Sequence, residues 1–376
     1  METLPLEGIT VLDFANFLSG PAAALRLADL GAEVIKIERP GVGDLCRNLV
    51  INDQKIGDNS LLFHTFNRNK KSVALNLKSE SDLEKVKKLI SSADVMIHNF
   101  RPGVMERIGL DYSVVSQLNP RIIYGSVSGY GDKGPWRDKP GQDLLVQSLS
   151  GLALLSGNAE HNPTPVGLPV LDIAASGNLV QGILAAIIRR GITGKGGLVE
   201  VDLMSCAFDI QFEQLTAYVN DNKEPSRSKI ANANIYGAAP YGIYKTADGY
   251  LALAMMPIAL LAELLECEAL NQFTQDDAFQ QRDEIKDIVA DAVKQRTTTA
   301  WLEVLEARDV WCADVLDWSR LLEEEGFKAL EPLQTVEVTG GAPIKTTRCP
   351  IRFDGEYITS SKPAPLLGAH TNQIIL

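Results

Sequence analysis

The sequence predicts an α/β protein in which a large Rossmann-like domain with a parallel sheet is joined to a smaller α/β domain. Three observations lead to this fold class. Residues 9–38 form a compact strand–helix–strand pattern, similar patterns recur up to residue 203, and the composition changes after residue 220. Strands that alternate with helices favour a parallel sheet, because each helix returns the chain to the start of the next strand.

The first strand–helix–strand unit is predicted from short patterns. Residues 9–14 are apolar and β-branched, as expected for a buried strand. Residues 19–21 (Ser-Gly-Pro) are typical of a helix start, residues 22–30 favour the helix, and Gly31 suits a position just after its end. Residues 32–38 are the next predicted strand.

The same alternation continues along the next 165 residues or so. The predicted strands are 72–77, 94–98, 121–126 and 198–203, and the predicted helices are 80–93, 104–108, 112–118, 143–154 and 173–190.

The polar segment 222–227 indicates a linker, and a second domain of mixed α/β type follows it. In that domain we expect a strand at 249–255, a helix at 260–268 and charged helices within 276–305, whereas 336–353 returns to short strands. The predicted domain bounds are 1–220 for the first part of the large domain, 221–229 for the linker, 230–325 for the small domain, and 326–376 for a return to the large domain.

Composition and charge exclude several classes of protein. The 376 residues contain 36 Lys and Arg against 48 Asp and Glu, a net charge of −12, which argues against nucleic-acid binding through phosphates. No run reaches the roughly 18 uninterrupted apolar residues of a membrane helix, and the first five residues lack the basic segment of a signal peptide. The five cysteines are scattered and odd in number, which indicates reduced thiols and not a set of disulfides. We therefore expect a cytoplasmic protein without a membrane partner.

The familiar nucleotide and hydrolase motifs are missing. The first strand-to-helix turn, residues 16–21, lacks the G-x-G-x-x-G spacing that a dinucleotide site needs, and Gly41-Val42-Gly43 opens no helix. No Walker A motif and no G-x-S-x-G elbow occurs. The four histidines are too dispersed to predict a metal site, so we expect no metal.

Polar residues cluster after three predicted strands, where parallel sheets bind ligands. The clusters are Lys36 with Glu38-Arg39, residues 69–72 (Asn-Lys-Lys-Ser), and residues 98–103 (His-Asn-Phe-Arg-Pro-Gly). Their basic side chains suit a phosphate-bearing ligand. Solvated loop charges are the other explanation, and the residues alone favour it.

Asp172 follows an apolar, strand-like run and precedes a predicted helix. This position suits a helix N-cap, and it also suits a reactive carboxylate close to a helix dipole. The residues alone leave both interpretations open.

A series of motifs extends along nearly the whole chain. They are Gly8-x-x-Val11-Leu12-Asp13-Phe14, Gly20-Pro21, residues 30–38, 69–78 and 94–103, Asn119 to Tyr124, residues 129–131 and 134–135, Gly141-x-Asp143, residues 150–152, Arg348-x-Pro350-Ile351-Arg352 and Gly368-x-His370-Thr371. Together these motifs resemble those of family III CoA-transferases.

This resemblance implies an interlocked homodimer, with a large Rossmann-like domain and a smaller domain in each chain. It also implies an enzyme that moves CoA between two carboxylic acids, with acyl-CoA and a carboxylic acid as substrates and no permanently bound cofactor. Asp172 falls on the family's nucleophile. The carboxylate would attack the acyl-CoA thioester to form a mixed anhydride, which CoA converts to an aspartyl-CoA thioester.

The resemblance places two further groups of residues. The implied CoA-binding residues are Leu18, Ser19, Arg39, Leu75, Asn76, Leu77, Lys78, Asn99, Phe100, Arg101, Arg107 and Lys139. The implied substrate-binding residues are Tyr236, Gly237 and Ala238, in place of a run of glycines. The bland explanation of the leucines is core packing.

Two departures narrow the activity. Asn16 and Leu18 stand where formyl-CoA transferases have His and Gln, so the formyl and oxalate pair is not implied. Gln142 stands where racemases of the family have a His, and an amide does not titrate. Transfer is therefore favoured over racemisation. An acyl-CoA racemase or isomerase and a non-catalytic CoA-binding protein remain the alternatives.

Overall fold

The structure is a computed structural model that describes residues 3–375, and the chain divides into two compact units. The large unit comprises the described residues of Met1–Val146, Pro169–Ile210 and Ala329–Leu376. The small unit comprises Gln147–Leu168 and Gln211–Lys328.

Residues 147–168 group with the small unit, whereas the sequence predicted that the large domain runs on to residue 220. The reason is a set of hydrogen bonds to a distant part of the chain. The Arg227 guanidinium donates to the carbonyl oxygens of Ser156, His161 and Asn162, and Ala159 N donates to Ser228 O. No change of composition marks this boundary.

The large unit contains a six-stranded, fully parallel sheet in the order β5-β2-β1-β6-β7-β8. This confirms the predicted parallel sheet, and its order is that of a doubly wound Rossmann sheet. The strands are β1 Thr10–Asp13, β2 Glu33–Glu38, β5 Lys71–Ala74, β6 Val95–His98, β7 Ile123–Ser128 and β8 Gly197–Asp202.

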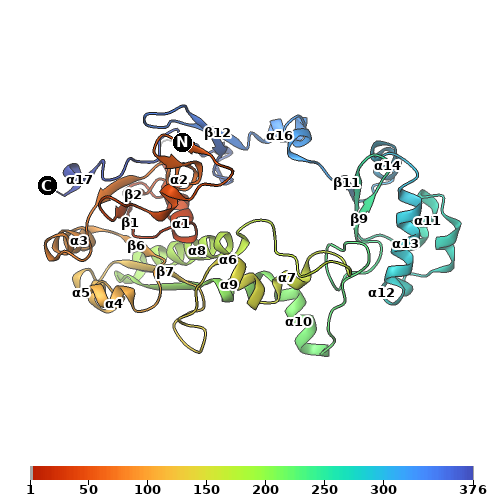
Figure 1. Ribbon diagram of the computed structural model, residues 1–376, viewed down its shortest axis with the longest axis horizontal. Coiled ribbons are helices and arrows are strands. Elements are labelled where there is room, and N and C mark those ends of the chain that lie inside the picture. Colours follow the sequence, from red (N-terminus) through yellow and green to blue (C-terminus); the bar gives the residue numbers. More distant parts are fainter. Residues whose placement is uncertain (1–2, 376) are drawn as a thin grey trace. The chain divides into compact units, whose positions relative to one another are not determined.

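Helices cover both faces of this sheet (Figure 1). Helices α1 (Ser19–Asp29) and α8 (Val170–Thr193) pack on each other, and α8 also packs on β7 and β8. On the opposite face, α3 (Glu80–Ser92), α4 (Val104–Ile108) and α5 (Tyr112–Leu118) bury Val86, Ile90, Met105 and Val115 against Leu12 and Met96. Period-two alternation in β1 and β6 supplies apolar side chains to both faces.

Helix α1 is built from small, helix-forming residues, and its start is crowded. A Cβ on Gly20 would lie 2.2 Å from the Ala15 Cβ, so only glycine fits there. Gly31, with φ +108°, provides the turn from α1 into β2. The predicted helix and its glycine end are confirmed within two or three residues.

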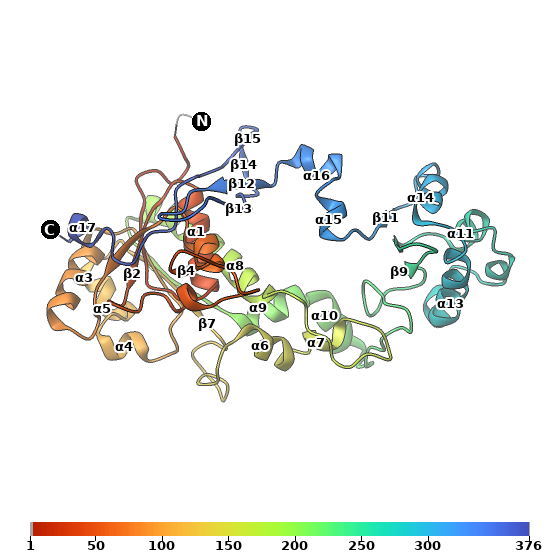
Figure 2. The ribbon, with the colours of Figure 1, turned by 45° about the horizontal axis from the view of Figure 1, so that its top comes forward.

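The C-terminal segment of the large unit, drawn in blue in Figure 2, is hydrogen-bonded to strand β5. Ser72 N donates to His370 Nδ1 and Ala74 N donates to Thr371 Oγ1, while Gly368 N donates to Ser72 Oγ. The segment contains the hairpins β12 Leu333–Val336 with β13 Ile344–Thr347 and β14 Arg352–Phe353 with β15 Glu356–Tyr357, then α17 Thr371–Ile374. The edge strand β5 is thereby covered.

The remaining elements of the large unit are short. They are the 3-10 turn Leu45–Asn48, β3 Lys55–Ile56, β4 Asn59–Ser60, α2 Leu61–Asn67 and α9 Leu203–Ile210, together with α6 Asp143–Leu149, whose last residues group with the small unit. The predicted helix 143–154 is in fact two helices, because Gly151, at φ +84°, breaks it before α7 (Leu152–Leu155).

The small unit has its own three-stranded antiparallel sheet, in the order β11-β10-β9, and its own core. Trp301, Tyr244 and Leu251 are buried at its centre. Its strands are β9 Gly242–Lys245, β10 Tyr250–Leu253 and β11 Cys312–Asp314. Besides α7, its helices are α10 Phe212–Asp221, α11 Ile258–Leu264, α12 Asp277–Gln280, α13 Arg282–Val293, α14 Thr298–Glu306, α15 Trp318–Leu321 and, at its end, α16 Glu325–Leu330, with a 3-10 turn at Glu268–Gln272.

Among the described residues, α8 alone is a helix long and apolar enough to cross a membrane, with 24 residues and a mean hydropathy of 1.6 over its most apolar window. The same composition is found in core helices of soluble proteins, and α8 packs on α1, α9, β7 and β8. The expectation of no membrane partner stays a prediction.

Candidate active site

The strand order makes the carboxyl ends of β1 and β6 a topological switch point of the sheet. These strands are neighbours, but the chain leaves β1 toward β2 and returns on the other side at β6. Ligands of doubly wound sheets bind at such a switch point, outside the carboxyl ends of the strands. The predicted residues Leu18 and Ser19 follow β1, and Asn99, Phe100 and Arg101 follow β6.

Asn99 ties the two loops together. Asn16 N donates to Asn99 Oδ1 at 2.8 Å, and Asn99 Nδ2 donates to Asn16 O at 2.7 Å. The same amide nitrogen lies 3.4 Å from Ser19 Oγ. This predicted CoA-binding residue therefore also fixes the shape of the turn before α1.

The turn contains a residue in a left-handed conformation. Phe17 has φ +64° and is 45% exposed, and its N–H donates to Asp44 Oδ1 at 3.0 Å. A non-glycine residue with positive φ needs support from its surroundings. Asp44, which is buried and also accepts from Cys46 N, provides that support.

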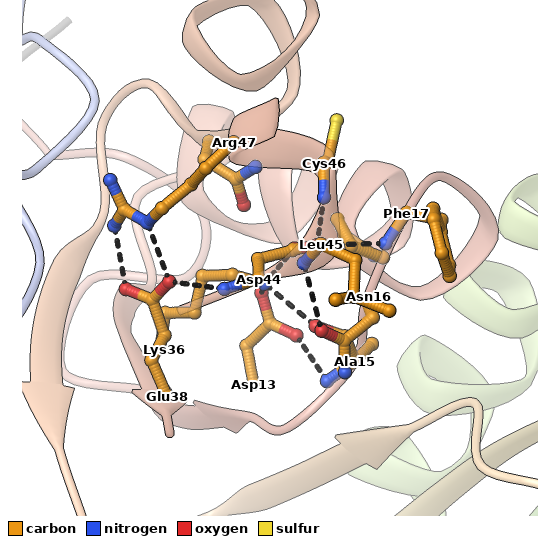
Figure 3. A network of polar contacts seen from close by, with 12 residues as sticks. Asp13, Ala15, Asn16, Phe17, Lys36, Glu38, Asp44, Leu45, Cys46 and Arg47 are labelled. Atoms are coloured by element: carbon orange, nitrogen blue, oxygen red, sulfur yellow. Dashed lines mark hydrogen bonds and ion pairs between the residues drawn. The ribbon is translucent and has the colours of Figure 1, made fainter. Parts of the chain in front are cut away.

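Asp44 belongs to a buried network of charges beneath the turn (Figure 3). Lys36 Nζ lies 2.8 Å from Asp44 Oδ2 and 3.5 Å from Asp13 Oδ2, and it donates to Ala15 O at 2.7 Å. Lys70 Nζ lies 2.8 Å from Asp13 Oδ2. Asp13 and Lys36 are partners in the register of β1 and β2, which brings the two charges together.

The network keeps its charges although water is excluded. Burial opposes the charge of Asp13, but the neighbouring ammonium groups outweigh it and hold the pKa of Asp13 below its usual value. Burial likewise opposes the charge of Lys36, yet Asp13, Asp44 and Glu38 raise its pKa. Lys70 differs, because burial and the like charge of Lys36 lower its pKa to about 8 despite Asp13.

This finding corrects the interpretation of two strand-end clusters. The sequence left two explanations for Lys36 and Lys70, a phosphate ligand or solvation, and both are wrong. Each side chain is buried and paired with carboxylates. Lys71, in the same cluster, is exposed and pairs with Glu33. The sequence does contain one signal of burial, because Lys36 lies between Ile35 and Ile37 inside an apolar strand.

Asp172 is the third residue of α8, and it is half-buried. The Ser19 side chain, at the start of α1, forms a hydrogen bond with it, which favours the carboxylate. Burial and the charge of Asp143 act the other way and are stronger, so the pKa of Asp172 is raised to about 6. A half-buried carboxylate of raised basicity, next to the switch-point turn, is suited to act as a nucleophile.

The helix-cap interpretation of Asp172 was wrong, and a different aspartate takes that role. The helix begins at Val170, three residues earlier than predicted, so Asp172 already lies in its first turn. Asp143 Oδ2 accepts hydrogen bonds from Leu171 N at 2.8 Å and from Asp172 N at 3.1 Å. The sequence named Asp143 only as part of a motif and gave it no task.

The basic side chains that the resemblance assigns to CoA phosphates are exposed to solvent. Among the described residues, none of these side chains forms an ion pair, in contrast to Lys36 and Lys70. They are Arg39 after β2, Lys78 beyond β5, Arg101 after β6, Arg107 on α4 and Lys139 in the loop before α6.

The neighbouring residues of the implied CoA site have mixed environments. Leu75 is buried in the core, so its side chain packs as the bland explanation stated. Asn76 is exposed, accepts from Lys78 N and donates its own N–H to Asp82, which shapes the turn. Phe100 is half-buried and stacks on His98, with ring centroids 6.0 Å apart, and Leu77 is half-buried.

A cavity of about 370 Å³ opens beyond β6, β7 and β8. Phe100 and Arg101 line one side of it. Its other lining includes the carboxylates of Glu106, Asp111, Asp132, Glu200 and Asp202, which disfavour a polyphosphate there. The described residues contain no group of three or more His, Cys, Asp and Glu that could hold a metal ion.

The implied substrate-binding residues Tyr236, Gly237 and Ala238 form a half-buried loop of the small unit. Asn232 Nδ2 donates to Gly237 O at 2.9 Å, and Lys286 Nζ of α13 donates to Asn232 Oδ1 at 2.8 Å and to Tyr241 O at 3.1 Å. Both ends of the loop are therefore held by α13.

Comparison with known proteins decides the family. The model of CoA-transferase family III matches residues 6–371. The chain belongs to CoA-transferase family III. It is an enzyme that transfers CoA, since CoA-transferases are its curated relatives over almost the whole length.

Two relatives illustrate this family III match. The succinyl-CoA:glutarate CoA-transferase of Homo sapiens is 30% identical over 378 residues, which make up 99% of this chain and 85% of that protein. The acetyl-CoA:oxalate CoA-transferase of Acetobacter aceti is 33% identical over 321 residues, 83% of this chain and 81% of that protein.

Solved structures of the family share the fold. A crystal structure of a mutant of Rv3272 from Mycobacterium tuberculosis matches with a TM-score of 0.86 and 27% identity, over 100% of this chain and 99% of that one. A CAIB/BAIF family protein from Brucella suis matches with a TM-score of 0.82 and 28% identity, over 99% and 98%. The mixed α/β fold with a parallel sheet is that of family III.

Proposed function

We propose that this enzyme is an acyl-CoA:carboxylate CoA-transferase whose nucleophile is Asp172. The supporting observation is the Asp172 carboxylate itself, which lies in the first turn of α8, bonds to Ser19 at the switch-point turn and has a raised pKa. A more basic carboxylate is a better nucleophile toward a thioester carbonyl.

The reaction proceeds in four balanced steps. Asp172 attacks the thioester carbonyl and the C–S bond breaks. CoA departs as the thiolate, and the acyl group stays on Asp172 as a mixed anhydride. The thiolate attacks the Asp172 carbonyl, releasing the donor carboxylate and forming an aspartyl-CoA thioester. The acceptor carboxylate attacks this thioester and expels CoA thiolate again. The thiolate finally attacks the acceptor carbonyl of the new anhydride, which yields the product acyl-CoA and free Asp172.

We place the CoA diphosphate and 3′-phosphate among the uncommitted cations at the sheet edge. Arg39, Lys78, Arg101 and Arg107 are exposed and their charges unpaired, so they are available for phosphate oxygens. The backbone at Leu18 and Ser19 and at Asn76 to Lys78 would line the nucleotide. Lys139 would add a further cation. CoA is a substrate in this account, and no permanently bound cofactor is required.

Removing one of these cations tests the CoA site. Arg101→Ala is expected to raise the Kd for CoA about tenfold, which corresponds to about 1.4 kcal/mol of a lost charge-assisted contact. Isothermal titration calorimetry measures this. Lys87→Ala is the matched control, because Lys87 is a partly exposed residue of α3 that is already paired with Glu84. Equal affinities of both variants and the wild type would contradict the placement.

For the substrates we propose CoA esters and acids of small dicarboxylates. The named relatives act on such acids: succinate with glutarate, and oxalate. The loop Tyr236-Gly237-Ala238 would contact the acid in place of the glycine run of formyl-CoA transferases. The hydrogen bonds that hold the ends of this loop to α13 support a loop of fixed shape.

The experiment is a matrix of acyl-CoA donors and acid acceptors, followed by chromatography of the CoA esters. New CoA esters that appear only when a donor and an acceptor are combined are the expected result. Parallel incubation of each acyl-CoA in heavy water tests racemisation. Exchange of the α-hydrogen without CoA movement would identify a racemase, and CoA binding without either reaction would identify a binding protein. Either outcome would contradict the proposal.

We also propose that the enzyme is a homodimer. Apolar side chains of α8, Ile188 and Ile192, are 68% and 83% exposed in the single chain, and Phe212 on α10 is 69% exposed. Ile188 and Ile192 are four residues apart and so share one face of α8, and neighbouring exposed apolar side chains mark a surface for protein contact. Light scattering after size-exclusion chromatography should give twice the mass of one chain. The mass of a single chain at micromolar concentration would contradict the dimer.

A further inference from the structure

Asp143 is held in place by a close crossing of the backbone. Within the large unit, the loop 130–140 begins and ends where Gly129 and Gly141 cross, and a Cβ on either glycine would lie 2.5 Å from the Cα of the other. Tyr130 Oη donates a hydrogen bond to Pro140 O, so the residues next to the two glycines are also linked. Asp143, two residues beyond the crossing, is only 5% exposed.

From this position the Asp143 carboxylate reaches the start of α8. Its Oδ2 accepts from the backbone N–H groups of Leu171 and Asp172, at 2.8 and 3.1 Å. A helix normally offers its first N–H groups to an anion, and its dipole stabilises negative charge in the first turn. Here two of those donors are already engaged by Asp143, so they are not available to the carboxylate of Asp172.

We infer that Asp143 is a positioning residue that fixes the start of α8 and that its negative charge destabilises the free carboxylate of Asp172 relative to the acylated forms. This inference rests on the proposed function, in which Asp172 alternates between a carboxylate and neutral acyl derivatives. Electrostatic repulsion between Asp143 and Asp172 exists only in the carboxylate form.

The consequence for the reaction follows from charge alone. Attack on a thioester carbonyl converts the charged Asp172 into a neutral anhydride, and the next step gives a neutral thioester. Each conversion relieves the repulsion by Asp143, so the covalent forms are favoured over the free enzyme. Asp143 itself touches no reacting atom.

Three influences account for the shifted pKa of Asp172. Its pKa is raised first by burial and second by Asp143, and lowered by the hydrogen bond to Ser19. The charged residues of the other elements packed on α8 are not among the causes of the shift: Arg26 and Asp29 on α1, Glu200 and Asp202 on β8, and Asp209 on α9.

The test separates charge from capping with three variants of Asp143. Asp143→Asn and Asp143→Ser keep a neutral oxygen acceptor for the start of α8, whereas Asp143→Ala removes it. Asp317→Asn is the matched control, because Asp317 caps α15 in the small unit by accepting from Arg320 N. Thermal unfolding reports whether each variant is folded.

The first readout does not depend on transfer. Carbodiimide labels protonated carboxyl groups, and mass spectrometry of the peptide that contains Asp172 gives the pH midpoint of its labelling. The midpoint should fall by on the order of one pH unit in Asp143→Asn, because a like charge nearby is lost. It should be unchanged in Asp317→Asn. Failure of the proposed function would leave this readout intact.

The second readout is the covalent intermediate. With acyl-CoA present, the equilibrium share of Asp172 held as CoA thioester should fall about tenfold in folded Asp143→Asn, in proportion to one pH unit. An unshifted midpoint and an unchanged thioester share in folded Asp143→Asn would overturn the inference. If neither neutral-acceptor variant folds, Asp143 is structural only and the inference is equally wrong.

Discussion

Replacing Asp172 with asparagine or alanine is expected to lower the rate of CoA transfer by at least about three orders of magnitude, because no anhydride can form without the carboxylate. The Kd for CoA should stay within about twofold, since the CoA phosphates are placed on other residues. Steady-state kinetics and calorimetry measure the two quantities. Asp209→Asn is the control, because Asp209 is an exposed residue of α9 and is not among the proposed site residues.

The pH dependence of the wild type belongs to the same prediction. The pKa of Asp172 is raised to about 6 by burial and by Asp143. Only the deprotonated form attacks, so kcat/KM should fall tenfold per pH unit below about 6 and level off above it. Asp172 variants with intact CoA binding but wild-type transfer rates would contradict the role of Asp172, whatever the shape of the pH profile.

The second large effect concerns the buried charges beneath the switch-point turn. Lys36→Met is expected to reduce the free energy of unfolding by about 3–5 kcal/mol, because it leaves Asp13 and Asp44 short of a partner in a site that excludes water. Lys36 is fully buried. The Lys36→Met variant also loses the hydrogen bond from Lys36 Nζ to Ala15 O, which holds the turn. Urea unfolding followed by circular dichroism measures the change.

Lys85→Met is the matched control for this variant. Lys85 is exposed and pairs with Asp82 three residues earlier on α3, so its loss should cost less than about 0.5 kcal/mol. If Lys36→Met cost no more than Lys85→Met, the network would not stabilise the fold. The pH dependence has a defined sign. The contribution of Asp13, with its lowered pKa, is present above the ordinary pKa of aspartate and is lost as the pH falls through the folded value.

The sequence predicted the strands and helices of the sheet, but it did not predict the buried charge network beneath the switch-point turn. The alternation of strands and helices identified β1, α1 and β2 within a few residues, because apolar periodicity and glycine placement are local signals. Lys36 and Lys70 were interpreted as ligand or solvent contacts. Their true partners, Asp13 and Asp44, are brought close only when the strands pair in register.

The start of α8 shows the same limit from another side. Asp172 was assigned through a resemblance, and nothing in its neighbours revealed that Asp143 caps the helix from 29 residues away. The cap depends on the crossing of Gly129 and Gly141, which is a tertiary contact. The grouping of residues 147–168 with the small unit likewise depends on the bonds of Arg227, which composition does not record.

Trapping of the covalent intermediate tests the central claim most directly. The enzyme is incubated with an acyl-CoA, treated with hydroxylamine and digested, and the peptides are analysed by mass spectrometry. Activated acyl groups on a carboxylate react with hydroxylamine, so we predict a hydroxamate on Asp172 that requires acyl-CoA and is absent from Asp172→Asn. Rapid transfer by the wild type with no hydroxamate on Asp172, or with the label on another residue, would contradict the account.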